Sequence, residues 1–239
     1  MTLIERCIEF WTSFVPDFPQ KIRGADAQAI ANVERVTKRP LSPVYREFLE
    51  RMSEDTGPLN LGLYDTSPGY LVDERWDVLE RLPLNAELFA SPTADDEQDI
   101  FLVHGEGSDP VVMRHAEIPR TNDGLFARSK AEAVAGSLTE LLCLPALNQY
   151  YSLQQPFRWV GREKERHENT FEHCKELAKG WRLTPYWFSN DQCLAARLGN
   201  LVLVAKQAPG FLFSVGIAGP EEHSIADISE TLRRELDLY

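Results

Sequence analysis

The chain opens with apolar residues at three- and four-residue spacing, the pattern of an amphipathic helix. Ile4, Ile8 and Trp11 would form one apolar stripe, and the helix should end before the proline-bounded turn at 16–19. We expect this stripe to pack on the helices that follow, because an apolar face needs a partner surface.

Two short helical patterns then meet at a corner. The first covers 29–36 and has to end before Pro40, because proline disfavours helical geometry at the residue that precedes it. Ser42 is placed to cap a second helix, and Pro43 suits its first turn, where no backbone N–H is needed. Apolar residues then repeat at helical spacing as far as Met52. The pattern predicts two helices held at a fixed angle.

The middle of the chain shows strand patterns followed by a helical one. Residues 59–64 and 70–72 resemble short strands, and the turn signal Ser67-Pro-Gly separates them. Two β-rich runs within 99–115 surround a glycine-containing loop, which indicates a hairpin. The pattern over 130–147 predicts one helix.

Beyond residue 156, a helix, several strands and a final helix are predicted. The first helix covers 162–179, with Gly180 as its C-cap. The last covers 225–238, where apolar residues again fall at helical spacing. Between them lie four strand patterns rich in aromatic and aliphatic residues: 183–188, 193–198, 201–206 and 211–217.

These elements predict an α+β protein in two domains. In the first, residues 1–150, a small and mostly antiparallel sheet is covered by helices. The second, residues 151–239, has the order α-β-β-β-β-α. The polar segment 150–156 ends in proline and is the expected linker. With 239 residues, 43% of them hydrophobic, the chain can bury a sizeable core in either part.

Negative charge is concentrated in the first domain. The formal net charge is −12 at pH 7. This disfavours nucleic-acid binding, which depends on Lys and Arg neutralising phosphates. Residues 1–150 carry −11 of this charge and residues 151–239 only −1. Within 54–99 there are twelve acids and two bases, so this stretch alone carries −10.

Cysteine spacing and hydropathy exclude several other classes of protein. The four cysteines, at positions 7, 143, 174 and 193, lack the short spacings of a zinc site or a redox Cys-x-x-Cys, so we expect buried thiols. The first residues have no signal-peptide pattern, and no apolar run approaches the roughly 18 residues of a membrane span. We therefore expect a cytoplasmic protein without a membrane segment.

The sequence offers little for catalysis or metal binding. It lacks Gly-x-Gly-x-x-Gly, the P-loop, His-Glu-x-x-His and Gly-x-Ser-x-Gly. The best metal candidate is His167 with Cys174, either alone or with His173 as a third ligand, because a spacing of seven falls on one helix face. Phe171 and Ala178 share that face, so a packed helix is the preferred explanation. We expect no metal and no cofactor.

The candidate binding residues lie in the acidic stretch 54–99. Four acids fall within five positions there, and an aromatic residue lies among further acids. Tyr and Trp are enriched at interface hot spots, and acids steer basic partners. We predict a protein-binding surface formed by Asp73, Glu74, Trp76, Asp95, Asp96, Glu97 and Asp99. The alternatives are a solvated acidic loop and ordinary core packing of the aromatic residue.

The corner sequence also carries a family resemblance. Ile30-x-x-Val-Glu34, followed by Leu41-x-Pro-x-Tyr-Arg-x-Phe-Leu49, resembles the opening of the SUKH superfamily, the Smi/Knr-like group of bacterial immunity proteins and fungal regulators. An acidic lead-in, a hairpin, Phe126-Ala-Arg-Ser and a closing helix follow in the family's order. Asp96-Glu-Gln-Asp99 stands where the family often has Gly-Gly-Asp. The resemblance covers residues 1–147 and implies an α+β protein-binding fold.

The resemblance implies a function in protein binding rather than catalysis. Members of the family neutralise toxins delivered by neighbouring bacteria, often nucleases. We therefore expect an immunity protein whose acidic stretch mimics substrate charge and binds a basic toxin domain. One alternative is a regulatory or scaffold protein with an endogenous cytoplasmic partner. Another is an enzyme or small-ligand binder with its site in residues 151–239.

Overall fold

The computed structural model describes residues 1–62, 64–93, 98–115, 118–121, 123–165, 167, 169–207 and 212–239. Within these residues the fold is α+β, with eight α-helices and two antiparallel sheets of five strands each, as predicted. The chain divides into two compact units, Met1–Leu142 and Cys143–Tyr239. The division lies inside helix α6 (Leu138–Ala146), a few residues before the expected boundary.

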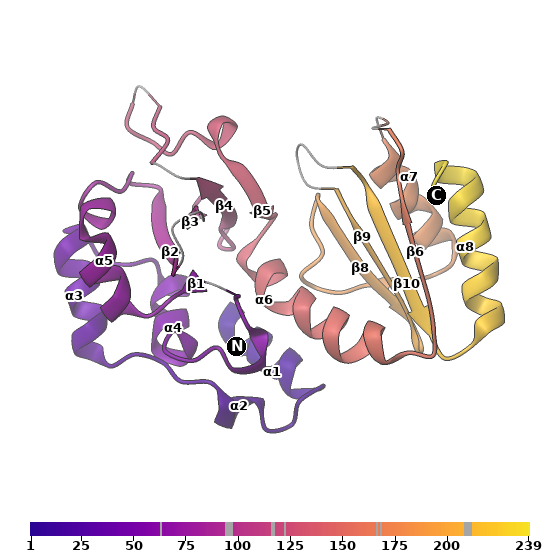
Figure 1. Ribbon diagram of the computed structural model, residues 1–239, viewed down its shortest axis with the longest axis horizontal. Helices are drawn as coiled ribbons and strands as arrows, with labels where there is room; N and C mark the ends of the chain where they lie inside the picture. The colour runs from indigo at the N-terminus through magenta and orange to yellow at the C-terminus, as the bar shows by residue number, and fades with distance from the viewer. Residues whose placement is uncertain are drawn as a thin grey trace. The chain divides into compact units, whose positions relative to one another are not determined.

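Helices and a meandering sheet make up the first unit (Figure 1). The helices are α1 (Leu3–Thr12), α2 (Phe18–Lys21), α3 (Ala27–Thr37), α4 (Pro43–Met52) and α5 (Pro68–Glu80), with 3₁₀ turns η1 (Gly57–Leu59) and η2 (Arg128–Lys130). The strands are β1 (Tyr64–Asp65), β2 (Ala86–Pro92), β3 (Asp99–Val103), β4 (Val111–His115) and β5 (Glu132–Ala135). They pair in chain order, each antiparallel to the next. The predicted hairpin at 99–115 is confirmed as β3 and β4.

The two-helix corner forms as the sequence predicts. The Ser42 hydroxyl accepts a hydrogen bond from the Tyr45 N–H and so caps α4. The apolar side of α4 packs on the sheet, where the rings of Phe48 and Phe89 of β2 lie 4.7 Å apart, centroid to centroid. The Tyr45 hydroxyl donates to the carbonyl of Leu88. Local capping and aromatic packing together fix the corner against β2.

The apolar stripe of α1 is also buried. Ile4 and Trp11 have no exposed surface. The Trp11 ring stacks on Phe18 with centroids 4.9 Å apart, and its indole N–H donates to the carbonyl of Leu142 at 2.6 Å. These contacts tie the beginning of the first unit to its end.

The first unit differs from the predicted elements in several places. Among the described residues of the predicted strand 59–64, only Tyr64 lies in a strand, β1, and strand β2 was not predicted. Residues 70–72 are helical rather than extended, because Ser67 occupies the N-cap position of α5 and a proline fits its first turn. Residues 130–147 are not one helix, since β5 precedes α6 there. Ala133 and Ala135 are buried as alternate residues of that strand. Small apolar residues fit either a helical or a strand period, so the spacing alone misled the prediction.

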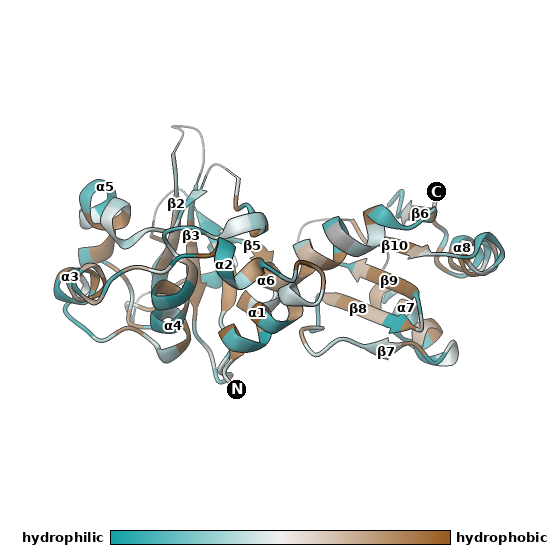
Figure 2. Cartoon of the chain, turned by 90° about the horizontal axis from the view of Figure 1, so that it is seen from below, coloured by the Kyte–Doolittle hydropathy of each residue, from teal (hydrophilic) through white to brown (hydrophobic). Residues whose placement is uncertain are grey.

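The second unit is a five-stranded sheet with two helices on one face. Its elements are η3 (Leu147–Tyr151), η4 (Ser152–Gln154), β6 (Phe157–Arg162), α7 (Thr170–Gly180), β7 (Thr184–Pro185), β8 (Cys193–Leu198), β9 (Leu201–Lys206), β10 (Ser214–Gly219) and α8 (Glu222–Leu236). The strand order is β6-β10-β9-β8-β7. Phe171 of α7, Leu203 of β9 and Leu232 of α8 share one buried core. Figure 2 shows the central strands β8, β9 and β10 mostly in brown and α8 largely in teal, as expected for a helix with one buried face.

The predicted α-β-β-β-β-α order is present in this unit, preceded by the unpredicted strand β6. Helix α7 begins at Thr170 rather than at 162. Of the predicted strand 183–188, only Thr184–Pro185 forms a strand, β7, which pairs with β8. The hairpin of β8 and β9 is confirmed, and Gly199 adopts the positive φ of 57° that its two-residue turn requires.

Candidate functional site

The predicted binding residues that the structure describes lie on and beside α5, where this helix is kinked. Arg75 leaves helical geometry, with φ −130° and ψ 25°. Its Nε donates to the Ser91 hydroxyl of β2 at 2.7 Å. The next residue, Trp76, is 56% exposed. The kink therefore directs one side chain to the sheet and leaves its neighbour at the surface.

Two of the predicted acids are exposed on the same helix. Asp73 and Glu74 lie immediately before the kink, and α5 packs against α3 and β2 on its other side. Within the described residues, neither acid makes an ion pair or a side-chain hydrogen bond. We call Asp73, Glu74 and Trp76 the α5 patch, an exposed aromatic residue with two uncompensated carboxylates.

The acids that follow the patch are paired. Asp77 lies 2.8 Å from Arg81, one turn along the helix. Glu80 lies 2.7 Å from Lys38, which follows α3. Exposed pairs of this kind contribute roughly 0–1 kcal/mol each to stability. Pairing leaves the α5 patch as the part of this helix with unbalanced negative charge.

Asp99 lies in the interior rather than on the predicted surface. It is 3% exposed at the start of β3. Its Oδ1 accepts a hydrogen bond from the Ser91 hydroxyl at 2.7 Å and lies 3.2 Å from Arg75 Nε. Burial raises the pKa of the Asp99 carboxyl above its ordinary value of 3.8, while Ser91 and the charge of Arg75 oppose that rise. Asp99 therefore stabilises the kink of α5 from the buried side, through its contact with Arg75.

The three remaining predicted acids, Asp95, Asp96 and Glu97, lie outside the described residues. The structure accordingly brings together Asp73, Glu74 and Trp76 as one exposed patch. It also places Asp99 behind that patch, linked to it through Arg75.

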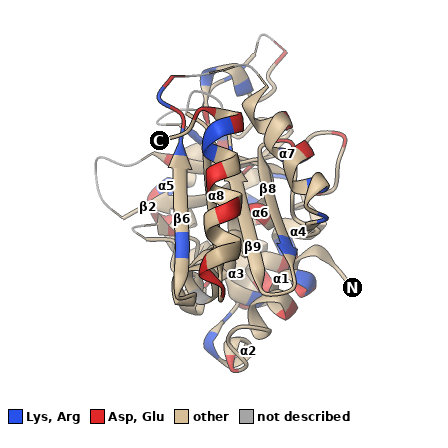
Figure 3. Cartoon of the chain, turned by 90° about the vertical axis from the view of Figure 1, so that its right-hand side faces the viewer, with Lys and Arg blue, Asp and Glu red and all other residues tan. Residues whose placement is uncertain are grey.

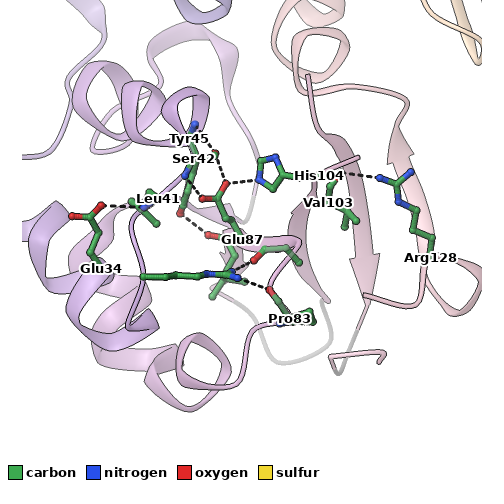
Figure 4. Close-up of polar contacts among 12 residues, drawn as sticks. Glu34, Leu41, Ser42, Tyr45, Pro83, Glu87, Val103, His104 and Arg128 are labelled. Atoms are coloured by element: carbon green, nitrogen blue, oxygen red, sulfur yellow. Dashed lines mark hydrogen bonds and ion pairs between the residues drawn. The ribbon is translucent and has the colours of Figure 1, made fainter. Parts of the chain in front are cut away.

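A buried carboxylate that the sequence did not single out joins the two-helix corner to the sheet (Figure 4). Glu87 of β2 is 5% exposed. It accepts hydrogen bonds from the Ser42 N–H and the Ser42 hydroxyl, both at 2.6 Å, and lies 2.7 Å from Nε2 of His104. Burial lowers the pKa of the neighbouring Arg39, and the negative charge of Glu87 opposes that change. This network holds α4 on β2.

The pairing of Glu87 with His104 resembles the orienting half of a general-base site. Such a site also needs a nucleophile or a substrate proton within reach of the imidazole. Within the part of the chain that the structure describes, no hydroxyl or thiol is bonded to His104. Both oxygens of Glu87 accept hydrogen bonds from the corner. Glu87 thereby forms a structural clamp between α4 and β2 while it contacts His104.

A second acidic surface, also absent from the sequence prediction, lies near this clamp. A groove of about 810 Å³ is bordered by the start of α1, by α4 and by the loop that joins β3 to β4. Its charged lining consists of Glu5, Glu47, Glu50 and Arg51, and Arg51 lies 3.6 Å from Glu5. Glu47 and Glu50 are three residues apart, so the helical period could have placed them on one face. Their meeting with α1 depends on the tertiary fold.

The candidate metal ligands do not come together. His167 is exposed and precedes α7, whereas His173 is exposed on that helix and Cys174 is buried. Burial raises the pKa of the Cys174 thiol to about 12, which disfavours the thiolate that binds zinc. Among the described residues, no group of three or more His, Cys, Asp or Glu is placed to hold a metal ion.

We expect Cys174 to resist alkylation in the folded protein. With a pKa of about 12, its thiolate fraction at pH 8 is roughly a thousandfold below that of a free cysteine with a pKa near 8.5. Iodoacetamide labelling followed by peptide mass spectrometry, with and without urea, measures this directly. Rapid labelling in the absence of urea would contradict the burial of this thiol.

The aromatic residues of the second unit serve mainly as packing. Tyr186 stacks on Phe188 with centroids 5.5 Å apart, and Phe188 and Phe213 are buried. Phe211 lies outside the described residues. Trp181, which is partly buried, lines a groove at one end of the sheet. Most of the described aromatic residues of this unit therefore contribute to its packing, and Trp181 also borders the groove.

Comparison with protein-family models, with curated proteins and with solved structures gives no match to this chain. Across the described residues, no helix is both long enough and apolar enough to cross a membrane. Function must therefore be inferred from the geometry of the surfaces and clusters of the chain itself.

Proposed function

We propose that this chain is a non-catalytic protein-binding module that holds a basic protein at the α5 patch. Support comes chiefly from one observation, the exposure of Trp76 beside two uncompensated acids. The two leucines of the helix, Leu71 and Leu79, are buried. Trp is among the residue types that dominate binding energy at protein interfaces.

Aromatic burial and charge make different contributions to such a complex. A Trp side chain buries roughly 150–250 Å², so covering the exposed half of Trp76 provides about 3 kcal/mol at 25 cal/mol per Å². An exposed ion pair provides roughly 0–1 kcal/mol. Trp76 therefore provides most of the affinity. Asp73 and Glu74 mainly speed association and select a partner whose surface is positively charged.

The kink supports this role because it positions Trp76 before any partner binds. Arg75 is held by Ser91 and Asp99, which belong to two neighbouring strands. A side chain carried by a rigid backbone loses less conformational freedom when it is covered. The Arg75 anchor thereby favours tight binding without contacting the partner itself.

The partner that we propose is a basic toxin domain, with this chain as its immunity protein. Nucleases bind phosphates and carry basic surfaces for that purpose, and an acidic patch around an aromatic anchor complements such a surface. An endogenous basic protein would engage the same patch, which would make the chain a regulator or scaffold. The identity of the captured protein distinguishes the two roles.

We expect Trp76→Ala to weaken partner binding by at least about tenfold, mainly through faster dissociation. The double change Asp73→Lys and Glu74→Lys should slow association and remove most of its salt dependence. The measurement is affinity capture from the native organism's lysate and secreted fraction, with mass spectrometry, followed by surface plasmon resonance of the captured protein.

Matched controls make the same kinds of change at exposed positions outside the α5 patch. Leu84→Ala removes an apolar side chain that is 84% exposed but lies outside the patch. Asp191→Lys with Glu230→Lys reverses two exposed charges of the second unit. Both controls should bind like the unaltered chain. Equal capture by the controls and the patch variants, or capture of no basic protein, would overturn the proposal.

A further inference from the structure

A groove of about 510 Å³ lies at one end of the sheet in the second unit. Four structural features form it: the C-cap residue of α7, the turn between β8 and β9, the connection from β10 to α8, and one face of α8. Its apolar lining includes Trp181, Leu198, Leu201, Ile225 and Ile228, and its acidic residues are Glu221 and Asp227. The groove thus combines an apolar floor with carboxylates.

The apolar floor is open to solvent. Leu198 is 53% exposed, although it ends a strand whose first four residues are buried. Trp181, Leu201 and Ile228 are only partly buried and pack on the core of the unit. Apolar surface that remains exposed beside a core is suited to covering by the apolar part of a ligand.

The charge of the groove has a single sign. Glu221 occupies the N-cap position of α8, and Asp227 lies further along the same helix. Figure 3 shows acidic residues along the N-terminal half of α8 and basic residues near its C-terminal end. Among the described residues that line the groove, none is Lys or Arg. His223 Nε2 lies 3.1 Å from Asp227 Oδ2 at the exposed side of the helix.

We infer that this groove binds a small organic cation, an ammonium group carried on an apolar and preferably aromatic body. The floor favours the apolar body, the two carboxylates exclude anions, and an indole is the best aromatic partner for an ammonium group. The groove volume falls within the range of small-ligand sites. This site belongs to the second unit and is independent of the proposed protein-binding patch.

Three probes that share an aromatic body and differ in charge test the inference: phenethylammonium, phenethyl alcohol and phenylacetate. We expect phenethylammonium to shift the Trp181 indole and α8 amide signals of the full chain in ¹H–¹⁵N spectra, with a millimolar Kd. The alcohol and the acid should bind at least about tenfold more weakly, because they lose the carboxylate and indole contacts to the cation.

Single substitutions assign the binding to this groove. Asp227→Asn should weaken phenethylammonium binding by about two- to fivefold and leave phenethyl alcohol unchanged, because the carboxylate is exposed and its charge is screened. Glu230→Gln, on the same helix but outside the groove, is the matched control and should change neither. Leu198→Ser should weaken the ammonium and the alcohol alike, because it removes part of the shared apolar floor.

Three results would overturn the inference. The first is binding of phenethyl alcohol as tight as that of the ammonium. The second is an equal loss in Asp227→Asn and Glu230→Gln. The third is the absence of shifts at Trp181 and α8 with about 10 mM phenethylammonium, tenfold above the expected Kd.

Discussion

Glu87→Ala is expected to lower the free energy of unfolding by about 3–5 kcal/mol. The substitution leaves the Ser42 N–H, the Ser42 hydroxyl and the His104 ring without their shared acceptor, inside a site where Glu87 is almost fully buried. Buried donors that lose a charged acceptor bear the full cost of desolvation. Urea unfolding at pH 7, followed by circular dichroism, measures the change.

Two further variants test the reason for that loss. Glu87→Gln retains the shape and one carbonyl acceptor, so we expect about half the loss. Glu50→Ala, which removes an exposed acid of α4, should change stability by less than about 0.5 kcal/mol. A Glu87→Ala protein within about 1 kcal/mol of the unaltered chain would show that the corner does not depend on this carboxylate.

The parts of the fold that could be predicted from sequence are those set by local chemistry. Helix α4 begins where Ser42 and Pro43 place it, because a cap and a first-turn proline act within one turn. The hairpin of β3 and β4 was predicted because its strands flank a glycine-containing loop. The final helix was predicted because Ile225 and Leu232 lie seven residues apart on its buried face.

The missed elements are those set by tertiary burial. Every residue of β2 is buried, including the polar Glu87 and Ser91. A strand covered on both faces lacks the alternation that identifies a strand, and polar residues within it interrupt the apolar run. No local signal shows that Glu87 meets Ser42 and His104. The polar network of the corner therefore became visible only in the fold.

The residues of the candidate site also differ in how far the sequence could predict them. Asp73, Glu74 and Trp76 are exposed, as a binding surface requires, because helix residues opposite an apolar face stay in water. The burial of Asp99 differs from the predicted surface position, because it depends on a partner from another element, Arg75 of α5. Composition showed that the segment is acidic, but it could not show which acid carries an internal partner.

Arg75→Met is expected to lower the free energy of unfolding by about 3 kcal/mol at pH 7. The substitution leaves Asp99 as a buried carboxylate with the Ser91 hydroxyl as its remaining described partner. Removing the neighbouring positive charge should raise the pKa of Asp99 further, because burial then acts against a weaker opposing interaction. Urea unfolding of the variant and the unaltered chain at pH 4 and pH 7 measures the loss.

The sign of the pH dependence follows from the raised pKa. Between the ordinary value of 3.8 and the higher pKa of the folded state, the folded protein binds more protons than the unfolded chain. The contribution of Asp99 to stability therefore falls as pH rises through this window and is constant above it. This pH range is wider in Arg75→Met, because its Asp99 has the higher pKa. The difference in free energy of unfolding between the two proteins should therefore grow as pH rises from about 4. An equal gap at both pH values would contradict this account.

A second substitution should reverse most of the loss. In Arg75→Met with Asp99→Asn, no buried charge remains unpaired, so we expect stability at pH 7 close to that of the unaltered chain. Arg81→Met, which removes an exposed pair with Asp77, is the matched control and should cost less than about 1 kcal/mol. The rescued double variant also separates stability from recognition. If its fold is restored, any remaining loss of partner binding belongs to the position of Trp76, which the Arg75 anchor holds.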